Sequence, residues 1–295
     1  KDIFAQAKTG SGKTGAFAIP IINNIITKKL KNNNSKGPFY LVLTPTRELT
    51  QQIEGVFQDF GSKINLKTLS IIGGEEYKHQ KQKLEDGTDI VIATPGRLID
   101  LYKQQSLNFN NIHGVVLDEA DRLFDMGFRK DIRFILEKIP TNRQLLMFSA
   151  TNHFDVLNMA YHFNSSPEEI ALTSDDNITV DSIEQSVIHV GDNEKVPLLV
   201  GILKNEVDPH CIIFCNTKSE THTISTWLQN INFGFNIKGI SGKLPQEKRS
   251  RIVKNFKEKK INILVSTDVA ARGLDIDNIS LVINYDLPQD PSSYV

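Results

Sequence analysis

The stretch AQAKTGSGKT, near the start of the chain, has the composition and spacing of a loop that binds a phosphate chain. Gly10 and Gly12 lack a Cβ, so the backbone can curl and direct its N–H groups inward. A helix-like stretch follows at once, and its partial positive N-terminus favours an anion. Lys13 is suited to reach the outer phosphates, and the Thr14 hydroxyl can bind Mg²⁺. We therefore predict a phosphate-binding loop.

Residues 115–121, VVLDEAD, predict the acidic partner of this loop. An apolar strand that ends at Asp118 places a carboxylate at the carboxyl edge of a sheet, where ligands bind in open α/β folds. Asp118 can bind the metal that Thr14 also contacts, and Glu119 can orient or deprotonate an attacking water. The alternative is that both acids simply begin the next helix, where they suit its dipole.

The elements that position these residues follow a strand–helix rhythm. Near-continuous apolar runs, typical of strands buried on both faces of a parallel sheet, are DIFAQA, FYLVLT, TLSIIG, DIVIAT, GVVLDEA and QLLMFSA. Helix-like segments such as TRELTQQIEGVFQDFG and FRKDIRFILEKI lie between them. This rhythm predicts an α/β fold with a mostly parallel sheet flanked by helices. Two irregularities are Ala7, where the phosphate-loop pattern has Gly, and Pro20, which should kink or shorten the helix after the loop.

A second domain is predicted from a change in composition. Residues 164–186 contain six acidic residues, no Lys or Arg and no aromatic residue. We predict domains over 1–176 and 181–295 with a linker at about 177–180, the alternative being an acidic surface loop. After the change the rhythm restarts with the runs SVIHV, CIIFCNT, FNIKGIS, INILVST and SLVINYD, separated by helical stretches. The second half therefore reads as another α/β sheet.

Composition excludes several classes of protein. The 34 basic and 35 acidic residues nearly cancel, so any nucleic-acid surface must be a local patch. No apolar run is long enough to cross a membrane. Cys211 and Cys215 are four residues apart on one predicted strand, too distant to form a disulfide, which indicates reduced thiols and a cytoplasmic protein. The chain starts at Lys1 without Met, and we expect it to be part of a longer protein.

Nine motifs, in one order along nearly the whole chain, then indicate a family. They are AKTGSGKT (7–14), PTREL (45–49), GG (73–74), TPGR (94–97), DEAD (118–121), SAT (149–151), IIFCNT (212–217), QEKR (246–249) and STDVAARGLD (266–275). With them the sequence resembles a DEAD-box ATP-dependent RNA helicase of superfamily 2. The resemblance implies two tandem RecA-like domains that close on ATP and RNA. It also implies a core truncated at both ends, because the family's adenine-reading segment would precede Lys1 and its arginine-rich motif would follow Val295.

The resemblance also implies roles for individual residues. The catalytic set is Lys13, Asp118, Glu119, Ser149 and Thr151, with Glu119 as the base and Asp121 linked to Ser149 and Thr151. The cofactors are ATP and Mg²⁺: the nucleotide contacts are Thr9, Gly10, Ser11, Gly12, Lys13, Thr14, Gly273 and Asp275, and the metal contacts are Thr14 and Asp118. The RNA contacts are Pro45, Thr46, Arg47, Gly74, Thr94, Gly96, Arg97, Thr217, Gln246, Arg249, Thr267 and Arg272.

The residues at the RNA positions agree with this implication. The loops that contain them follow predicted strands and offer backbone N–H groups, hydroxyls and arginines, which suit phosphates and 2′-hydroxyls better than base edges. Ordinary turn and helix-capping chemistry is the alternative for PTREL and TPGR. Residues 241–260 carry eight Lys or Arg and two Glu, and are either a basic helix that contacts RNA or a solvated helix face.

We therefore expect a monomeric, RNA-dependent ATPase that binds RNA without sequence preference and locally unwinds short duplexes. The sequence predicts ATP binding more firmly than ATP hydrolysis. The arginine-rich motif would follow Val295, and an arginine finger can contribute about 10³ to 10⁵ in rate. The alternatives are an ATP-gated RNA clamp with little turnover and another P-loop motor, such as a DNA translocase. RNA-stimulated ATP hydrolysis separates the three.

Overall fold

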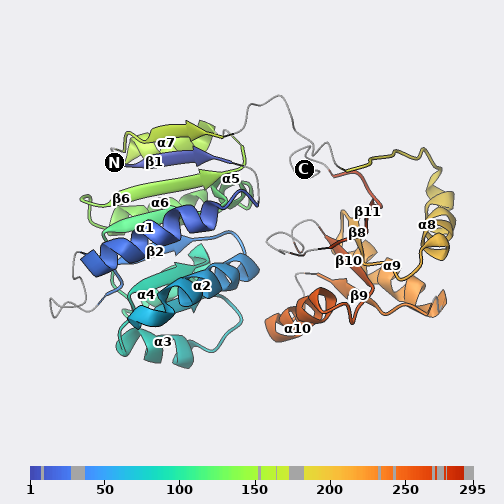
Figure 1. Ribbon diagram of the computed structural model, residues 1–295, viewed down its shortest axis with the longest axis horizontal. Coiled ribbons are helices and arrows are strands. Elements are labelled where there is room, and N and C mark those ends of the chain that lie inside the picture. Colours follow the sequence, from blue (N-terminus) through green and yellow to red (C-terminus); the bar gives the residue numbers. More distant parts are fainter. Residues whose placement is uncertain are drawn as a thin grey trace. The chain divides into compact units, whose positions relative to one another are not determined.

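The computed structural model describes residues 1–7, 10–27, 37–151, 154–163, 165–172, 183–231, 234–241, 244–267, 270, 276 and 278–288. The chain divides into two compact units, Lys1–Asp175 and Asp176–Val295, which we call unit 1 and unit 2 (Figure 1). The predicted linker at 177–180 lies outside the described residues, so the domain limits 1–176 and 181–295 remain our proposal.

Unit 1 contains a seven-stranded parallel sheet in the order β3-β4-β2-β5-β6-β1-β7. Its strands are β1 (Ile3–Gln6), β2 (Tyr40–Leu43), β3 (Thr68–Ile71), β4 (Ile90–Ala93), β5 (Gly114–Leu117), β6 (Gln144–Ser149) and β7 (Glu168–Ala171). Its helices are α1 (Lys13–Thr27), α2 (Arg47–Gly61), the 3₁₀ turn η2 (Ser62–Ile64), α3 (Tyr77–Glu85), α4 (Pro95–Lys103), α5 (Ala120–Asp125), α6 (Arg129–Lys138) and α7 (Phe154–His162).

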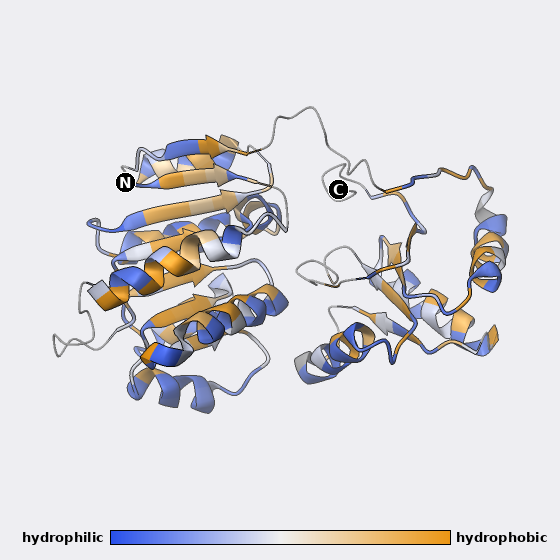
Figure 2. Ribbon diagram, in the orientation of Figure 1, coloured by the Kyte–Doolittle hydropathy of each residue, from blue (hydrophilic) through white to orange (hydrophobic). Residues whose placement is uncertain are grey.

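Helices cover both faces of this sheet, as the continuous apolar strands predict. Successive strand residues point to opposite faces, so Leu41 and Leu43 belong to one buried cluster and Val42 to the other. Helices α1 and α2 pack on the face of Val42, and α4 to α7 pack on the face of Leu41. Figure 2 shows the apolar strands between these layers and the hydrophilic faces of the helices. The six predicted strands of the first half are confirmed as β1 to β6.

Two details of unit 1 differ from expectation. Helix α1 continues through Pro20 to Thr27, so Pro20 does not shorten it. Pro20 and Ala16 are both exposed, and the Ala16 carbonyl, which loses its usual N–H partner, can bind water instead. Strand β7 was not predicted, because it begins the acidic segment and its four residues are exposed at the sheet edge, where no apolar run marks it.

Unit 2 contains a four-stranded parallel sheet in the order β11-β8-β10-β9. Its strands are β8 (Cys211–Cys215), β9 (Ile237–Ile240), β10 (Ile263–Thr267) and β11 (Leu281–Asn284). Its helices are the 3₁₀ turn η3 (Asp192–Glu194), α8 (Lys195–Asn205), α9 (Lys218–Ile231) and α10 (Gln246–Lys257). Helices α8 and α9 pack on one face of the sheet, and α10 packs on the other.

The run SVIHV at residues 186–190 is not a strand, which corrects the sequence prediction. Val187 is 74% exposed and Ile188 is 54% exposed, and none of the described strands pairs with this run, so β-branched residues alone do not make it a strand. The other four predicted strands of the second half are confirmed. Cys211 and Cys215 are free and buried, and burial raises the pKa of the Cys211 thiol to about 12.

Candidate active site

The candidate site lies at the carboxyl edge of the unit 1 sheet. Strand β6 lies between β1, which precedes the phosphate loop, and β5, which precedes the acidic pair. Because all of these strands are parallel, their carboxyl ends meet at one edge, and the SAT motif after β6 lies between the other two motifs. The sheet order therefore brings together three motifs that are far apart in the sequence.

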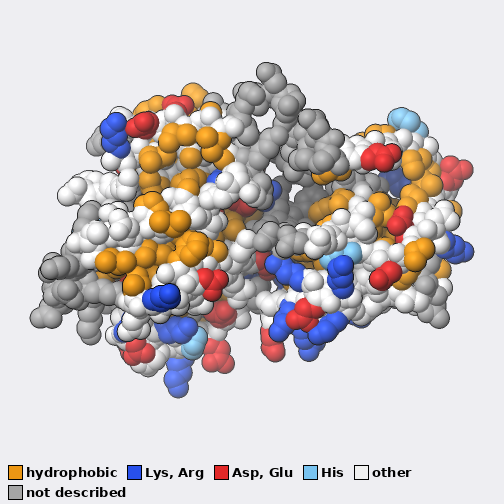
Figure 3. Space-filling model, in the orientation of Figure 1, with side chains coloured by type: hydrophobic (Ala, Val, Ile, Leu, Met, Phe, Trp, Pro, Cys, Tyr) orange, Lys and Arg blue, Asp and Glu red, His pale blue; other side chains and the backbone are white. Residues whose placement is uncertain are grey.

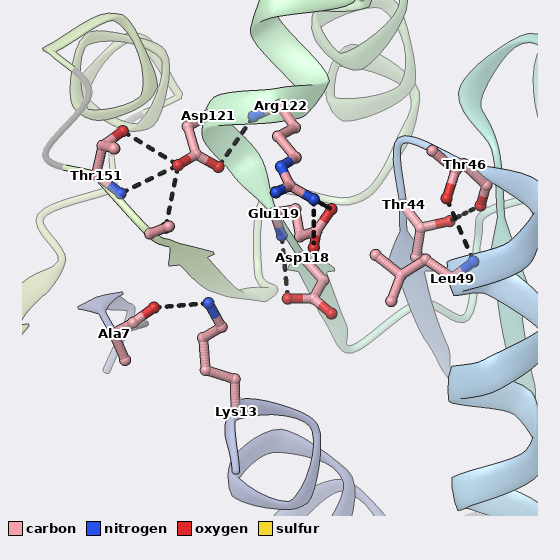
Figure 4. Close-up of polar contacts among 11 residues, drawn as sticks. Ala7, Lys13, Thr44, Thr46, Leu49, Asp118, Glu119, Asp121, Arg122 and Thr151 are labelled. Atoms are coloured by element: carbon pink, nitrogen blue, oxygen red, sulfur yellow. Dashed lines mark hydrogen bonds and ion pairs between the residues drawn. The ribbon is translucent and has the colours of Figure 1, made fainter. Parts of the chain in front are cut away.

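The phosphate loop closes between β1 and α1. Gly10 and Gly12 have φ angles of +79° and +87°, a backbone conformation that other residues adopt rarely. An added Cβ at either glycine would meet nothing within 4 Å, so backbone conformation, rather than space, requires glycine here. The Lys13 ammonium donates a hydrogen bond of 2.6 Å to the Ala7 carbonyl, across the loop (Figure 4).

The remaining phosphate-loop residues take the places that the sequence predicts. Ser11 is exposed, and Thr14 lies in the first turn of α1, beside Lys13. The Ala7 N–H donates to the carbonyl of Ser149, which fixes the start of the loop against β6. Thr9 lies outside the described residues.

Asp118 is almost completely buried at the end of β5, with 3% of its surface exposed. Its backbone N–H donates to the Leu43 carbonyl, and its carboxylate accepts from the Glu119 N–H at 3.0 Å. The pKa of Asp118 is raised to about 7: burial is the largest cause, the neighbouring Glu119 charge also raises it, and the Lys13 ammonium lowers it. A buried carboxylate that is costly to ionise alone is well suited to accept a cation.

Glu119 occupies an unusual backbone position. Its φ of +49° places it in the left-handed region, directly before α5. Such a conformation costs energy for a residue other than glycine, and strain of this kind gathers at functional sites. Both oxygens of its carboxylate lie 3.2 Å from the Arg122 guanidinium, which donates to them. Arg122 was not among the predicted site residues, although its spacing of three from Glu119 on a helix is a signal for such a pair.

Asp121 joins the acidic motif to the SAT motif (Figure 4). One oxygen of its carboxylate accepts from the backbone N–H groups of Ala150 and Thr151, at 3.1 and 3.0 Å, and from the Thr151 hydroxyl at 3.1 Å. Its other oxygen accepts from the Arg122 N–H at 2.9 Å. Asp121 thus carries four hydrogen bonds and fixes the segment after β6 against the start of α5.

The hydroxyl of Ser149 is the unsatisfied member of this group. Its Oγ is buried, and it has no hydrogen-bond partner among the residues that the structure describes. Leaving such a hydroxyl unpaired costs about 1–3 kcal/mol. An unpaired buried hydroxyl beside a predicted catalytic centre is consistent with a partner that arrives with a ligand or water.

The donor set fits Mg²⁺. This ion keeps several waters and typically takes one or two protein carboxylates together with substrate phosphates. Asp118 and the Thr14 hydroxyl meet that requirement, whereas the described part of the chain contains no cluster of three or more His, Cys, Asp or Glu that could hold a metal by itself. A metal at this site therefore needs the phosphates of a nucleotide as further ligands.

The predicted RNA residues of unit 1 lie in loops and first helical turns at the same sheet edge. Thr46 caps helix α2, because its hydroxyl accepts from the Leu49 N–H at 3.3 Å (Figure 4). This hydroxyl therefore caps a helix, as the alternative interpretation expected. The backbone of Pro45 and Thr46 still lies at the N-terminus of α2. Arg47 lies beside Gly73, where an added Cβ would come within 3.2 Å of the guanidinium.

The TPGR loop lies against the GG loop. Thr94 precedes α4 in an extended conformation, and its side chain makes no capping hydrogen bond. Gly96 is exposed, and Gly74 has a φ of +91°. Arg97 donates from Nη1 to the Glu75 carbonyl at 3.0 Å, so the two predicted RNA-contacting loops are directly bonded.

In unit 2, Thr217 and Glu220 form a reciprocal cap at the start of α9. The Thr217 hydroxyl donates to the Glu220 carboxylate at 2.7 Å and accepts from the Glu220 N–H at 3.1 Å. The carboxylate in turn accepts from the Thr217 N–H at 3.0 Å. The Thr217 hydroxyl therefore has a structural role whether or not it contacts RNA.

Thr267 and Arg249 converge on Ala270. The Thr267 hydroxyl accepts from the Ala270 N–H, and Arg249 donates to the Ala270 carbonyl at 2.7 Å. These bonds tie helix α10 to the segment after β10. Arg272, Gly273, Asp275 and the side chain of Gln246 lie outside the described residues, so their predicted roles are untested.

Lys and Arg side chains gather over α10, together with acidic ones (Figure 3). Glu258, just after the helix, pairs with Lys254 at 3.9 Å and also with Lys260, which neutralises part of the local charge. Both interpretations of this basic segment, an RNA contact and a solvated helix face, stay open.

A phosphate loop that faces a buried acidic pair, on the parallel sheet of the first of two α/β units, defines a nucleotide-binding P-loop protein. Residues 1–159 match the family model of the DEAD/DEAH box helicases, and residues 194–295 match that of the helicase conserved C-terminal domain. The chain belongs to the DEAD/DEAH box helicase family, with two tandem RecA-like domains, which confirms the resemblance and the fold predicted from the sequence.

Similar proteins cover the whole chain. It is 40% identical to the ATP-dependent RNA helicase RhlB of Xanthomonas oryzae pv. oryzae, and 41% identical to the ATP-dependent RNA helicase DeaD of Buchnera aphidicola. The alignments include 100% of this chain and 51% and 48% of those proteins, so the chain spans about half the length of these curated relatives.

Solved structures of helicases are also similar. The DEAD-box helicase Mss116, bound to single-stranded RNA and UDP-BeF, is 32% identical over 99% of this chain and 62% of its own, with a TM-score of 0.88. A DEAD box protein from Methanococcus jannaschii is 39% identical over 99% of this chain and 76% of its own, with a TM-score of 0.54. In the described residues, no helix has the length and apolar character needed to cross a membrane.

Proposed function

We propose that this chain is the core of an ATP-dependent RNA helicase that binds the RNA sugar–phosphate backbone and locally opens short duplexes. Membership of the DEAD/DEAH box family supports the proposal, as do relatives named ATP-dependent RNA helicases. ATP and RNA would favour one common form of the protein, so each raises the affinity for the other.

The hydrogen bonds of Asp121 carry this proposal most directly. A motor must transmit the state of its nucleotide to another part of the molecule. Asp121 lies three residues after Asp118 and holds Ala150 and Thr151 through three hydrogen bonds to one carboxylate oxygen. A shift of the acidic motif is therefore transmitted directly to the segment after β6.

The nucleotide roles follow from the positions of the side chains. We assign Lys13 to the outer phosphates of ATP, because its ammonium already lies across the phosphate loop. Asp118 and Thr14 would hold Mg²⁺, which supplies neutralisation of the phosphate charge when bound. Glu119 would accept the proton of the attacking water, once its carboxylate is released from Arg122.

The RNA roles rest on loops that present backbone groups and arginines. Pro45, Thr46, Arg47, Gly74, Thr94, Gly96 and Arg97 in unit 1, and Thr217, Gln246, Arg249, Thr267 and Arg272 in unit 2, are our proposed contacts. Such groups suit phosphates and 2′-hydroxyls, so we propose recognition without sequence preference. We further propose a monomer in the cytoplasm, consistent with two free thiols.

ATP hydrolysis, measured with single-stranded RNA, with DNA of the same sequence and without nucleic acid, tests the proposal. Stimulation by RNA but not by DNA is expected, together with ATP-dependent displacement of a strand from a short RNA duplex. Equal stimulation by DNA would support a DNA translocase instead. Nucleotide-dependent RNA binding without turnover would support an RNA clamp. Lys13→Ala, which removes the ammonium from the phosphate loop, is the inactive control.

A further inference from the structure

Arg97, a proposed RNA contact, is held on three sides by groups outside the family motifs. Its Nη1 donates to the Glu75 carbonyl at 3.0 Å and to the Gln80 side-chain oxygen at 3.3 Å. Its guanidinium carbon lies 3.9 Å from the centroid of the Tyr77 ring, within the range of a cation–π contact. We call Glu75, Tyr77 and Gln80 the Arg97 seat.

The seat is rigid on the side of Gln80. This side chain is completely buried, and its amide nitrogen donates to the Ile72 carbonyl at 3.1 Å and to the Glu75 carboxylate at 3.0 Å. Both amide hydrogens are therefore used, and the amide oxygen must face Arg97. One acceptor of the seat is thus fixed by the fold rather than by Arg97 itself.

Tyr77 forms the exposed wall of the seat. It is the first residue of α3 and is 38% exposed, and its ring covers the guanidinium of Arg97 on the neighbouring helix α4. Its hydroxyl donates to the Asp100 carboxylate at 3.2 Å, one turn after Arg97. The ring and the hydroxyl therefore both contact α4, which fixes the plane of the guanidinium.

The seat leaves part of the guanidinium available. Only Nη1 makes a hydrogen bond to the described protein, so Nη2 and Nε keep their hydrogens for another acceptor. An arginine held in one plane with two donors available can bind a phosphate through both, and less rotational freedom is then lost on binding. A seat of this kind favours an RNA phosphate over a base edge.

We propose that Tyr77 is a positioning residue, which holds Arg97 ready for an RNA phosphate and so sets the RNA affinity of this chain. The inference rests on the proposed RNA function. Its physical basis is pre-organisation: without the ring, Arg97 samples other rotamers, and binding must restrict them again. ATP binding does not involve this seat and is expected to stay unchanged.

The test compares Tyr77→Ala, Tyr77→Phe, Arg97→Ala and the double variant Tyr77→Ala/Arg97→Ala in RNA-stimulated ATP hydrolysis with polyuridine RNA. Tyr77→Ala should raise the RNA concentration for half-maximal stimulation about threefold to fivefold, in proportion to an exposed cation–π contact. At saturating RNA, the maximal rate and the half-saturating ATP concentration should stay at their original values. Tyr77→Phe keeps the ring and should remain within about twofold.

The double variant separates positioning from a direct contact. If Tyr77 acts through Arg97, Tyr77→Ala should have no further effect once Arg97 is alanine. Arg97→Ala should also make the slope of log RNA affinity against log salt concentration shallower, by about the amount expected for one phosphate contact. Tyr77→Ala should make this slope shallower as well. Tyr161→Ala is the matched control, because Tyr161 is a 52% exposed tyrosine of the same unit on helix α7.

Four results would overturn the positioning role while the helicase function stood. The first is an unchanged RNA requirement in Tyr77→Ala, and the second is a double variant in which the effects of the two alanine substitutions on RNA affinity add fully. The third is an equal effect of Tyr77→Phe and Tyr77→Ala, and the fourth is an unchanged RNA affinity in Arg97→Ala. The second would indicate that the ring itself stacks on RNA. Absence of any RNA stimulation in the original chain would instead reject the proposed function, and this inference with it.

Discussion

Replacing Asp118 with asparagine should stabilise the protein that lacks nucleotide, even though it removes a proposed metal ligand. Asp118 is buried, and its pKa is raised from 3.8 to about 7, chiefly by burial and then by the Glu119 charge. A raised carboxyl pKa means that the folded chain binds more protons than the unfolded chain between these values. The stability contributed by the protonated carboxyl is therefore complete at low pH and is lost as the pH rises through 7.

The size of the effect follows from the shift. One pKa unit corresponds to about 1.4 kcal/mol, so a shift from 3.8 to about 7 corresponds to at most about 4 kcal/mol of unfolding free energy above pH 7. Asparagine keeps an oxygen that can accept from the Glu119 N–H and carries no charge. The stability of Asp118→Asn relative to the original chain should thus increase between pH 5 and pH 8.

Urea unfolding without Mg²⁺ or nucleotide, at both pH values, measures this difference. The sequence contains a single tryptophan, Trp227 in α9, so its fluorescence reports on unit 2. Hydrogen exchange of β5 amides reports on unit 1, where the change is expected. Asp59→Asn, at an exposed residue of α2, is the control and should change stability by no more than about 0.5 kcal/mol.

The stability difference between Asp118→Asn and the original chain should change between pH 5 and pH 8. If it is the same at both pH values, the argument from burial is refuted. A second measurement checks the metal role. Mg-ATP should raise the stability of the original chain, since a ligand that binds only the folded state stabilises it. The same addition should have a smaller effect on Asp118→Asn, because one proposed metal ligand is absent.

Three further predictions concern the motifs. Glu119→Gln should keep ATP binding, lower turnover by about 10²-fold or more and trap the RNA complex; unchanged turnover would remove Glu119 from its proposed role as base. Asp121→Asn should weaken the acceptor of the Ala150 and Thr151 hydrogen bonds, so RNA stimulation should fall more than ATP affinity, and a parallel loss of both would contradict the coupling role. Thr217→Ala should lower the unfolding free energy of unit 2 by about 1 kcal/mol, because it removes the cap of α9, whereas Thr217→Ser should retain the cap. Unfolding followed by Trp227 fluorescence measures this difference, and equal stability of the two variants would show that the cap contributes nothing.

Much of the fold could be predicted from the sequence because its strands are buried on both faces. A run such as YLVL has to be covered by helices on both sides, and the structure places it inside the unit 1 sheet, between β4 and β5. The edge strand β7 lacked this signal, because its residues are exposed. SVIHV has β-branched residues but is exposed, and no strand pairs with it in the part of the chain that the structure describes. Burial, rather than β-propensity, accounts for the difference.

The site was predictable as a set of motifs but not as a set of contacts. Gly10, Gly12 and Lys13 could be assigned from local spacing, since a tight loop before a helix needs these residue types. The bond between Asp121 and Thr151 spans 30 residues and depends on the order of the strands, which spacing does not determine. The Arg97 seat depends in the same way on the packing of α3 beside α4.

The capping interpretation and the RNA interpretation of the motif threonines are compatible. Thr46 and Thr217 use their hydroxyls to begin α2 and α9, and each cap holds the N-terminal turn of a helix in place. Backbone N–H groups in the first turn of a helix, together with the helix dipole, favour a phosphate. A threonine that caps a helix can therefore serve RNA binding without touching the RNA through its hydroxyl. Serine at these two positions should then preserve RNA affinity, whereas alanine should reduce it together with helix stability.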